Sequence, residues 1–150
     1  MNVDQAVIYR IVALQTAAGA RVYMLRLPQM PTTLPAVRVQ LIDDPEEYHL
    51  RGGTVGRARV QVDCFAEEGS GVDPYQDASD LADEVNGDDA GSGMSGWIGS
   101  VGSPPTIEIT GAFRLDRAAS YDPDERRRVR MRMDFRVHYR RPSQGQEGSP

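Results

Sequence analysis

The residues of this chain best suited to chemistry form a row of arginines near its C-terminal end. Between Val129 and Arg140, apolar and polar residues alternate without a break, a period of two that only an extended strand produces. We call the arginines on the polar side the arginine row: Arg128, Arg130, Arg132, Arg136 and Arg140. A guanidinium is a planar fork that stays protonated and pairs with carboxylates or phosphates. The chemistry of this row is therefore binding, because none of its members can act as a nucleophile.

The other reactive residue types form no catalytic or metal-binding pattern. Cys64 is the only cysteine and lies on the apolar side of a predicted strand, which favours a small buried hydrophobe over a nucleophile. His49 and His138 have neither a nearby cysteine nor the spacing of zinc ligands. The glycines between residues 91 and 102 precede a strand, whereas a phosphate-binding loop opens a helix. We expect no enzymatic activity, no cofactor and no metal site.

Length and composition are typical of one folded domain. The chain has 150 residues, 39% of them hydrophobic, and a net charge of −5, and its 17 basic residues are all arginine. Its start lacks the layout of a signal peptide, and no apolar run approaches the ~20 residues that span a bilayer. We expect a soluble domain over residues 1–140, made in a reducing compartment, and a disordered tail over residues 141–150.

Two segments have helical periodicity. The first is residues 3–17, with Asn2 as N-cap, Gln5 as its partner and Gly19 as the stop signal. The second begins at Asp73-Pro74, an N-cap followed by proline at the first helical position, with Gln76 as the N3 partner. The exposed side of the second helix is acidic and includes Asp77, Asp80 and Asp83.

Strands are predicted at residues 36–41, 57–64, 106–115 and 129–140, with short extended pieces at 21–23 and 47–51. Residues 87–105 are predicted as a long flexible loop anchored by Trp97 and Ile98, and residues 116–126 as a polar hairpin loop. The fold class is α+β in two layers. An antiparallel or mixed sheet of four to five strands has two helices packed on one face.

Three interpretations of the arginine row remain open. A basic sheet face can track the phosphates of a nucleic acid, although the net charge is negative and stacking aromatics are scarce. Alternatively, the row meets the acidic helix residues Asp77, Asp80 and Asp83 of another copy, in a head-to-tail contact that closes into a ring. The third interpretation is a solvated strand face.

The sequence resembles the tail terminator family, also called tail completion proteins, of long-tailed phages and gene-transfer particles. The resemblance runs from about residue 3 to 140 and combines both helical segments with a few diffuse motifs. These are residues 19–23 (GARVY), 27–29 (LPQ), 34–40 (LPAVRVQ), 56–66 (GRARVQVDCFA) and 133–140 (MDFRVHYR). The Gly/Ser-rich stretch after Asn86 departs from the family pattern, because it is longer and looser than a simple turn.

The resemblance implies a structural virion protein without catalytic residues. Members of the family form a six-fold ring at the head-proximal end of the tail, where the ring stops polymerisation of the tail tube and offers a docking surface to the head–tail connector or stopper. The expected partners are therefore other copies of the chain, the tail-tube protein and the connector, with neither a small-molecule substrate nor a membrane. The expected location is the virion, and the host cytoplasm during assembly.

Two alternatives remain beside this one. Another neck component, such as a connector or stopper, would share the ring and the lack of catalytic chemistry. A nucleic-acid-binding module would use the arginine row instead, and its affinity would fall steeply with salt.

Overall fold

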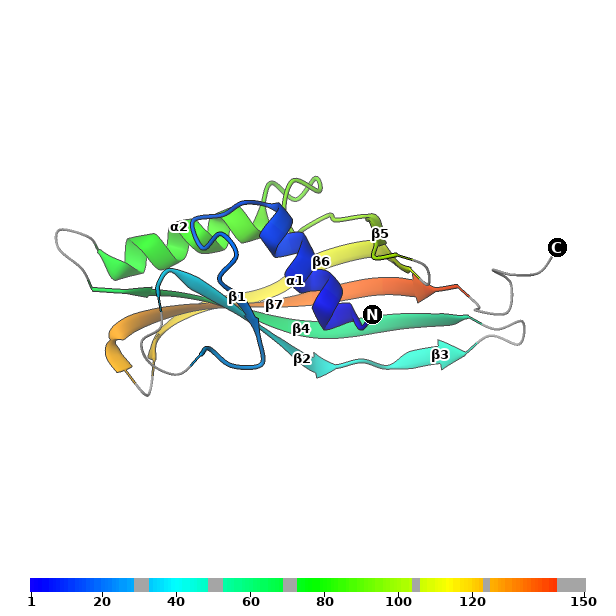
Figure 1. Cartoon of the computed structure of the whole chain (residues 1–150), viewed down its shortest axis with the longest axis horizontal. Helices are drawn as coiled ribbons and strands as arrows, with labels where there is room; N and C mark the ends of the chain where they lie inside the picture. Colours follow the sequence, from blue (N-terminus) through cyan, green and yellow to red (C-terminus); the bar gives the residue numbers. More distant parts are fainter. Residues whose placement is uncertain (29–32, 49–52, 69–72, 104–105, 123–124, 143–150) are drawn as a thin grey trace.

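The computed structural model describes residues 1–28, 33–48, 53–68, 73–103, 106–122 and 125–142. Within these residues, two helices and seven strands follow one another along the chain (Figure 1). Their order is α1 (Val3–Ala13), β1 (Val22–Met24), β2 (Ala36–Asp43), β3 (Glu46–Tyr48), β4 (Thr54–Glu67), α2 (Pro74–Asn86), β5 (Gly99–Val101), β6 (Ile107–Asp122) and β7 (Glu125–Arg141).

All seven strands belong to one curled, mixed sheet with the strand order β1-β2-β4-β7-β6-β5, and β3 pairs with β4 beside β2. Only the β1–β2 pair is parallel. The α+β class and the mixed sheet are confirmed, but the prediction of four to five strands is wrong. The short extended pieces predicted at 21–23 and 47–51 correspond to β1 and β3, whereas β5 lies within the predicted loop 87–105 and has only three residues, too few to show a period.

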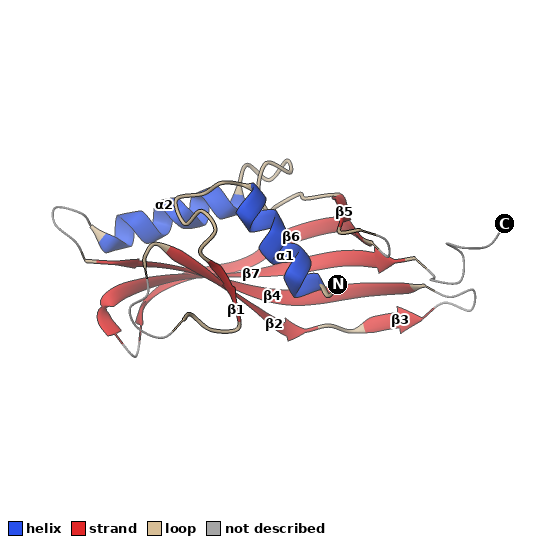
Figure 2. Cartoon of the chain, in the orientation of Figure 1, coloured by secondary structure: helices blue, strands red, loops and turns tan. Residues whose placement is uncertain are grey.

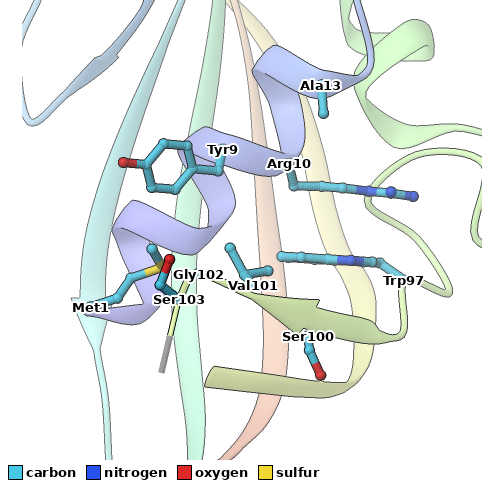
Figure 3. Close-up of a pocket in the computed structure, with 9 residues that line it drawn as sticks. All are labelled: Met1, Tyr9, Arg10, Ala13, Trp97, Ser100, Val101, Gly102 and Ser103. Atoms are coloured by element: carbon cyan, nitrogen blue, oxygen red, sulfur yellow. The ribbon is translucent and has the colours of Figure 1, made fainter. Parts of the chain in front are cut away.

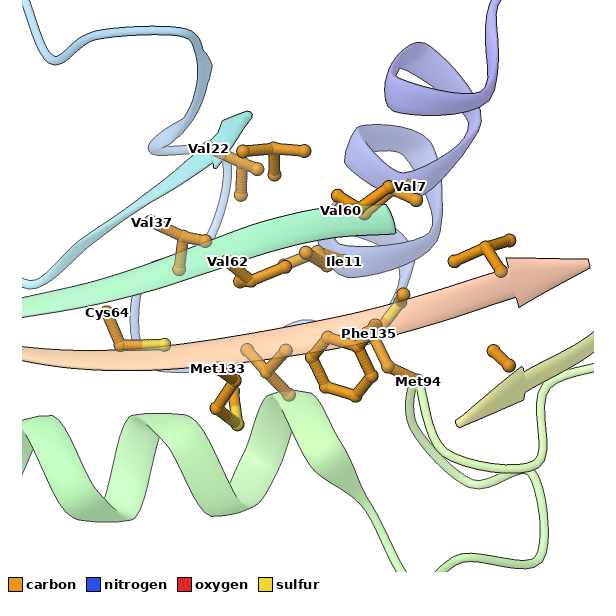
Figure 4. Close-up of a cluster of buried hydrophobic side chains, with 14 of the residues drawn as sticks. Val7, Ile11, Val22, Val37, Val60, Val62, Cys64, Met94, Met133 and Phe135 are labelled. Carbon is orange, nitrogen blue, oxygen red and sulfur yellow. The ribbon is translucent and has the colours of Figure 1, made fainter. Parts of the chain in front are cut away.

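The core lies between the sheet and the two helices, which cover the same face (Figure 2). Helix α1 contacts β1 and β2, whereas α2 contacts β4 and β7. The core side of β7 is buried from Val129 to Tyr139, as the alternation predicts. We call the opposite side of the sheet the helix-free face. Figure 4 shows the centre of the core, including Val60, Val62, Met133 and Phe135.

Both predicted N-caps are present, but α1 is shorter than predicted. Asn2 and Gln5 form a capping box at the start of α1. The helix ends at Ala13, four residues early, because Leu14 caps it and Gln15 adopts a positive φ of 54°. The Asp73 side chain accepts a hydrogen bond from the Tyr75 amide, whereas Gln76 donates to Asp80 instead of closing a capping box.

A bulge in β6 reverses one predicted orientation. Ile109 pairs with Tyr139 and Gly111 with His138, so Thr110 is an extra residue between two consecutive partners. The alternation of residues 106–115 predicts Phe113 on the same side of the strand as Ile107 and Ile109. Because of the bulge, Phe113 lies on the helix-free face instead and is 54% exposed.

The segment after α2 is more ordered than a loose loop. The amides of Met94 and Ser95 donate to the main-chain oxygens of Val85 and Asn86. Met94 is fully buried beside Phe135 (Figure 4), and Trp97 is nearly so. The anchor prediction is right for Trp97 and wrong for Ile98, which is exposed. The same segment continues into β5.

Three predicted boundaries also change. The hairpin loop predicted at 116–126 is mostly strand, because β6 continues to Asp122 and β7 begins at Glu125. Arg141 is the last residue of β7, so the predicted tail cannot start there, and residues 143–150 lie outside the described part. The strand predicted to start at residue 57 begins at Thr54, so Gly56 lies inside β4 with the Tyr139 ring against it.

Replacing Phe135 with Ala should destabilise the fold by about 3–5 kcal/mol, because the fully buried ring would leave a cavity. Phe113→Ala removes the same side chain from the helix-free face and should change stability by less than about 1 kcal/mol. Denaturant unfolding of both variants measures the difference. Equal losses would mean that the bulge at Thr110 is misplaced.

Candidate functional site on the helix-free face of the sheet

Strand pairing places the whole arginine row on the helix-free face. β7 pairs with β4 without interruption from Arg128 opposite Glu67 to Arg141 opposite Thr54. The even-numbered residues of β7 therefore lie beside the odd-numbered residues of β4, and both sets point away from the helices. This part of the prediction is confirmed.

At the centre of this face lies a buried carboxylate, Asp63 on β4. Its side chain is 0% exposed, and Arg38 on β2 donates to Oδ2 through Nη2 at 2.6 Å and Nε at 3.1 Å. The amide of Gln61 donates to the same carboxylate at 3.0 Å. Arg38 also stacks on the Phe65 ring, 5.2 Å from its centroid. These contacts satisfy a charge that would otherwise be costly to bury.

A second buried carboxylate, Asp134, interrupts the arginine row. Arg59 on β4 holds it at 3.0 Å, and its side chain is only 6% exposed. Because Gln61 pairs with Asp134 in the register, the Arg59–Asp134 contact is diagonal. Breaking the Arg59–Asp134 ion pair would therefore leave the buried charge of Asp134 without its cation.

The members of the arginine row also have partners within the chain. Arg132 pairs with Asp116 at 3.3 Å, Arg140 with Glu108, and Arg128 lies 3.8 Å from Glu67. Arg130 donates to the Ser120 hydroxyl (3.3 Å), and Arg136 to the main-chain oxygen of Arg57 (3.1 Å). The helix-free face is thus a network of cross-strand ion pairs.

The acidic residues of α2 lie on the other side of the sheet. Asp83 accepts from Arg117 of β6 at 2.6 Å, Asp80 accepts from Gln76, and Asp77 lines a small cleft beside Glu67 and Glu68. A single chain does not bring Asp77, Asp80 and Asp83 to the arginine row. Their contact between copies stays a prediction.

A compact polar cluster that the sequence did not reveal surrounds Tyr139 at the end of β7. Its hydroxyl lies 2.6 Å from Asp44 Oδ1 and 2.7 Å from Glu46 Oε1, and Arg141 reaches Glu46 at 3.2 Å. A phenol has one proton, so it can donate in full to only one of the two carboxyl oxygens, and a proton on Asp44 would satisfy the second contact. Burial raises the pKa of Asp44 above 3.8, and the charge of Glu46 adds to the rise, against the hydrogen bond from Tyr139.

Gly56 makes this cluster possible. A Cβ atom at this position would lie 2.2 Å from Cζ of Tyr139, so no other residue leaves room for the ring. One sequence feature does point to this cluster. Tyr139 lies on the apolar side of β7, and a tyrosine hydroxyl that is buried in a core needs a hydrogen-bond partner.

Two clefts flank the sheet. One, of about 510 Å³ on the helix-free face, is lined by Pro45, Glu47, Val55, Arg57, Arg136 and His138. The other, of about 570 Å³, lies between α1 and β5 (Figure 3). There Arg10 stacks over Trp97, 5.5 Å from the ring centroid, and donates to the main-chain oxygens of Gly91 and Gly93. This stacking ties α1 to the loop that follows α2.

No model of a known protein family matches the chain, and no curated protein sequence matches it significantly. Among the described residues, no helix is both long and apolar enough to pass through a membrane. The same residues hold no group of three His, Cys, Asp or Glu side chains placed to bind a metal ion.

The remaining candidate residues also have defined positions. Cys64 is buried in the core, as predicted, and burial, with a further contribution from the charge of Asp63, raises the pKa of its thiol. His138 lies on the helix-free face, with its ring edge-on to Phe113 at 5.6 Å between centroids. His49 lies outside the described residues.

Replacing Arg38 with Met should destabilise the fold by about 3–5 kcal/mol, because it leaves the Asp63 carboxylate buried without its cation. The control is Arg140→Met, on the same face. The Arg140 side chain is 59% exposed, so its ion pair should contribute less than about 1 kcal/mol. Urea unfolding of both variants tests this, and a similar small loss for each would show that Asp63 does not depend on Arg38.

Asp44→Asn should alter the pH dependence of stability. The folded state raises the Asp44 pKa, so the protonated acid stabilises the fold fully below about pH 4, and this contribution is lost as pH rises through the raised pKa. Asparagine keeps an acceptor for Tyr139 but cannot ionise. The unfolding free energy of the variant minus that of the wild type should therefore increase from pH 4 to pH 7. Glu68→Gln, an exposed change at the far end of the sheet, should show no such slope.

Proposed function

We propose that this chain is a structural protein of a phage tail or a related particle, a tail terminator. In this role, copies of the chain close into a ring at the head-proximal end of the tail tube, stop its polymerisation and offer a docking surface to the head–tail connector or stopper. The chain would act in the virion after assembly in the host cytoplasm. The proposal assigns it no catalytic residue, cofactor or metal.

The observation that carries the proposal is the order of the elements along the chain. A helix precedes β1 and β2, a long hairpin strand follows, and a second helix precedes the β6–β7 pair. The motifs that resemble the tail terminator family lie in this same order. The resemblance also implies a mixed sheet flanked by helices, and the sheet of this chain is mixed and carries both helices.

The helix-free face favours a contact role over the binding of nucleic acid. Carboxylates of the chain itself hold Arg38, Arg59, Arg132 and Arg140. A phosphate would have to displace these acids, and displacing Asp63 or Asp134 would leave a buried charge. Another protein could pack against this face without displacing these acids from their arginines.

The proposal predicts a ring of defined stoichiometry. Size-exclusion chromatography with light scattering and negative-stain microscopy should show closed rings, alone or after addition of the tail-tube protein encoded in the same gene cluster. Adding the chain to polymerising tube protein should shorten the tubes and leave a ring at one end. A chain that remains monomeric and leaves tube length unchanged would falsify the proposal.

The same samples separate the terminator from the alternatives. Rings that bind the connector but never the tube end would indicate another neck component. DNA binding that weakens steeply with salt, without ring formation, would indicate a nucleic-acid-binding module.

A further inference from the structure

Within the described residues, each of the two edges of the sheet has a stretch that no neighbouring strand covers. On one side, β5 pairs only with residues 107–109 of β6, and the Gly96 amide donates a hydrogen bond to the main-chain oxygen of Ala112. From residue 113 to 121, β6 pairs only with β7 within the described part of the chain. We call these residues the β6 border. Phe113, Leu115 and Tyr121 are exposed along it.

The opposite side of the sheet has a similar gap. β1 pairs with β2 only at residues 37–39, and the Leu25 amide donates a hydrogen bond to the main-chain oxygen of Val39. Among described residues, no strand lies outside residues 41–43, and β3 continues this side of the sheet (Figure 1). We call residues 41–47 the β2 border. Leu41 and Ile42 are exposed on it. An uncovered strand edge with exposed apolar side chains is a place where another strand adds.

The two borders share rows of paired residues across the sheet, and their strands run antiparallel to each other. Asp43 pairs with Arg59, Arg59 with Arg136, and Arg136 with Phe113, so Asp43 and Phe113 stand in one row at opposite ends. Each border also carries a bulge close to this row. Ile42 is the extra residue between the rows of Arg59 and Val60, and Leu115 is the extra residue one row further on, between the rows of Val60 and Gln61. Three successive antiparallel pairings separate β2 from β6, which therefore run in opposite directions. A second copy placed alongside, without inversion, would meet the first as an antiparallel pair.

The charges of the two borders are complementary. Arg114 is exposed on the β6 border and has no ion-pair or hydrogen-bond partner within the described part of the chain. The β2 border carries four acids, Asp43, Asp44, Glu46 and Glu47. Arg114 thus differs from the paired members of the arginine row, because its charge remains available to a partner.

We propose that residues 113–115 on the β6 border of one copy pair with residues 41–43 on the β2 border of a second copy. The contact continues the sheet from copy to copy, brings Leu115 against Leu41 and Ile42, and places Arg114 beside the acidic border. Because the two surfaces differ, the contact is heterologous and leaves each copy with one free border of each kind, as a ring requires. The inference rests on the proposed ring and specifies its subunit contact.

Engineered cysteines test the row alignment. In a Cys64→Ala background, Asp43→Cys and Phe113→Cys would face each other across the contact, with Cα atoms about 4.5–5.5 Å apart, within disulfide range. The double variant should form a ladder of disulfide-linked species under mild oxidation. Each single variant should give none, and a 1:1 mixture of the singles should stop at dimers. The matched control combines Asp43→Cys with Tyr121→Cys, at the far end of the same border, and should form no ladder.

A charge change supplies a second, independent measurement. Arg114→Glu should weaken association at least about tenfold, because it sets like charge against the acidic border. Arg140→Glu, an exposed arginine of the helix-free face, should leave association within about twofold. Sedimentation velocity measures both, and circular dichroism confirms that the variants fold.

The outcomes separate this contact from the proposed function. Rings that form normally with Arg114→Glu and give no 43–113 disulfide overturn the border contact and leave the terminator proposal standing. Loss of rings with Arg140→Glu but not Arg114→Glu assigns the contact to the arginine row instead. Dimers from a single-cysteine variant indicate a symmetric contact and overturn the inference. A wild-type chain that neither assembles nor caps tubes overturns both proposals.

Discussion

The pairing of β7 with β4 and β6 is the constraint on which the rest of the structure depends. β7 is the longest strand and pairs with β4 over fourteen consecutive positions. Its two sides require different surroundings, because one carries Phe135 and Met133, which are buried in the core, and the other carries the arginine row. A slip of one residue would place guanidinium groups under the helices and aromatic rings in water. The register is therefore strongly specified, and it sets the position of every element that packs on the sheet.

This register also determines the electrostatics of the helix-free face. Asp63 and Asp134 are buried beside Arg38 and Arg59, so the face is held together by ion pairs that are costly to break. Such pairs add little net stability relative to apolar residues. Removing one partner, however, leaves a buried charge, and this favours one register over its neighbours. A phosphate or carboxylate from another molecule would therefore have to compete with Asp63 and Asp134 for Arg38 and Arg59.

The bulges link this closed face to the borders. A bulge at residues 41–43 and another at residues 114–116 lie on either side of the row that contains Val60 and Phe135, at opposite edges of the sheet, and each brings an apolar side chain into solvent. Bulges usually protect an edge by twisting it away from partners. Here both bulged edges retain exposed leucines, and one retains Arg114, which has no partner among the described residues. The margins of the sheet are therefore better suited to contact with a second copy than its centre.

Much of this architecture was predictable from the residues alone. The alternation in β7 and β4 determined which side chains are buried, and Asn2, Asp73 and Pro74 marked where the helices begin. These features are local, because a strand's period and a helix cap depend on residues close together in the chain. The resemblance to tail terminators likewise lies in the sequence, in motifs spread from about residue 3 to 140.

Other features depended on contacts between distant segments, which no local pattern encodes. The bulge that turns Phe113 outward is defined only by its pairing with β7, and the three-residue strands exist because longer neighbours hold them. Gly56 and Tyr139 meet across two strands, with Glu46 coming from a third strand, β3, and Asp44 from the connection between β2 and β3. The sequence showed that arginines share a face, but only the tertiary structure paired them with Asp63, Asp116, Asp134 and Glu108. Within the described part of the chain, it left Arg114 without an ion-pair or hydrogen-bond partner, because charge neutralisation is decided by cross-strand distance and not by composition.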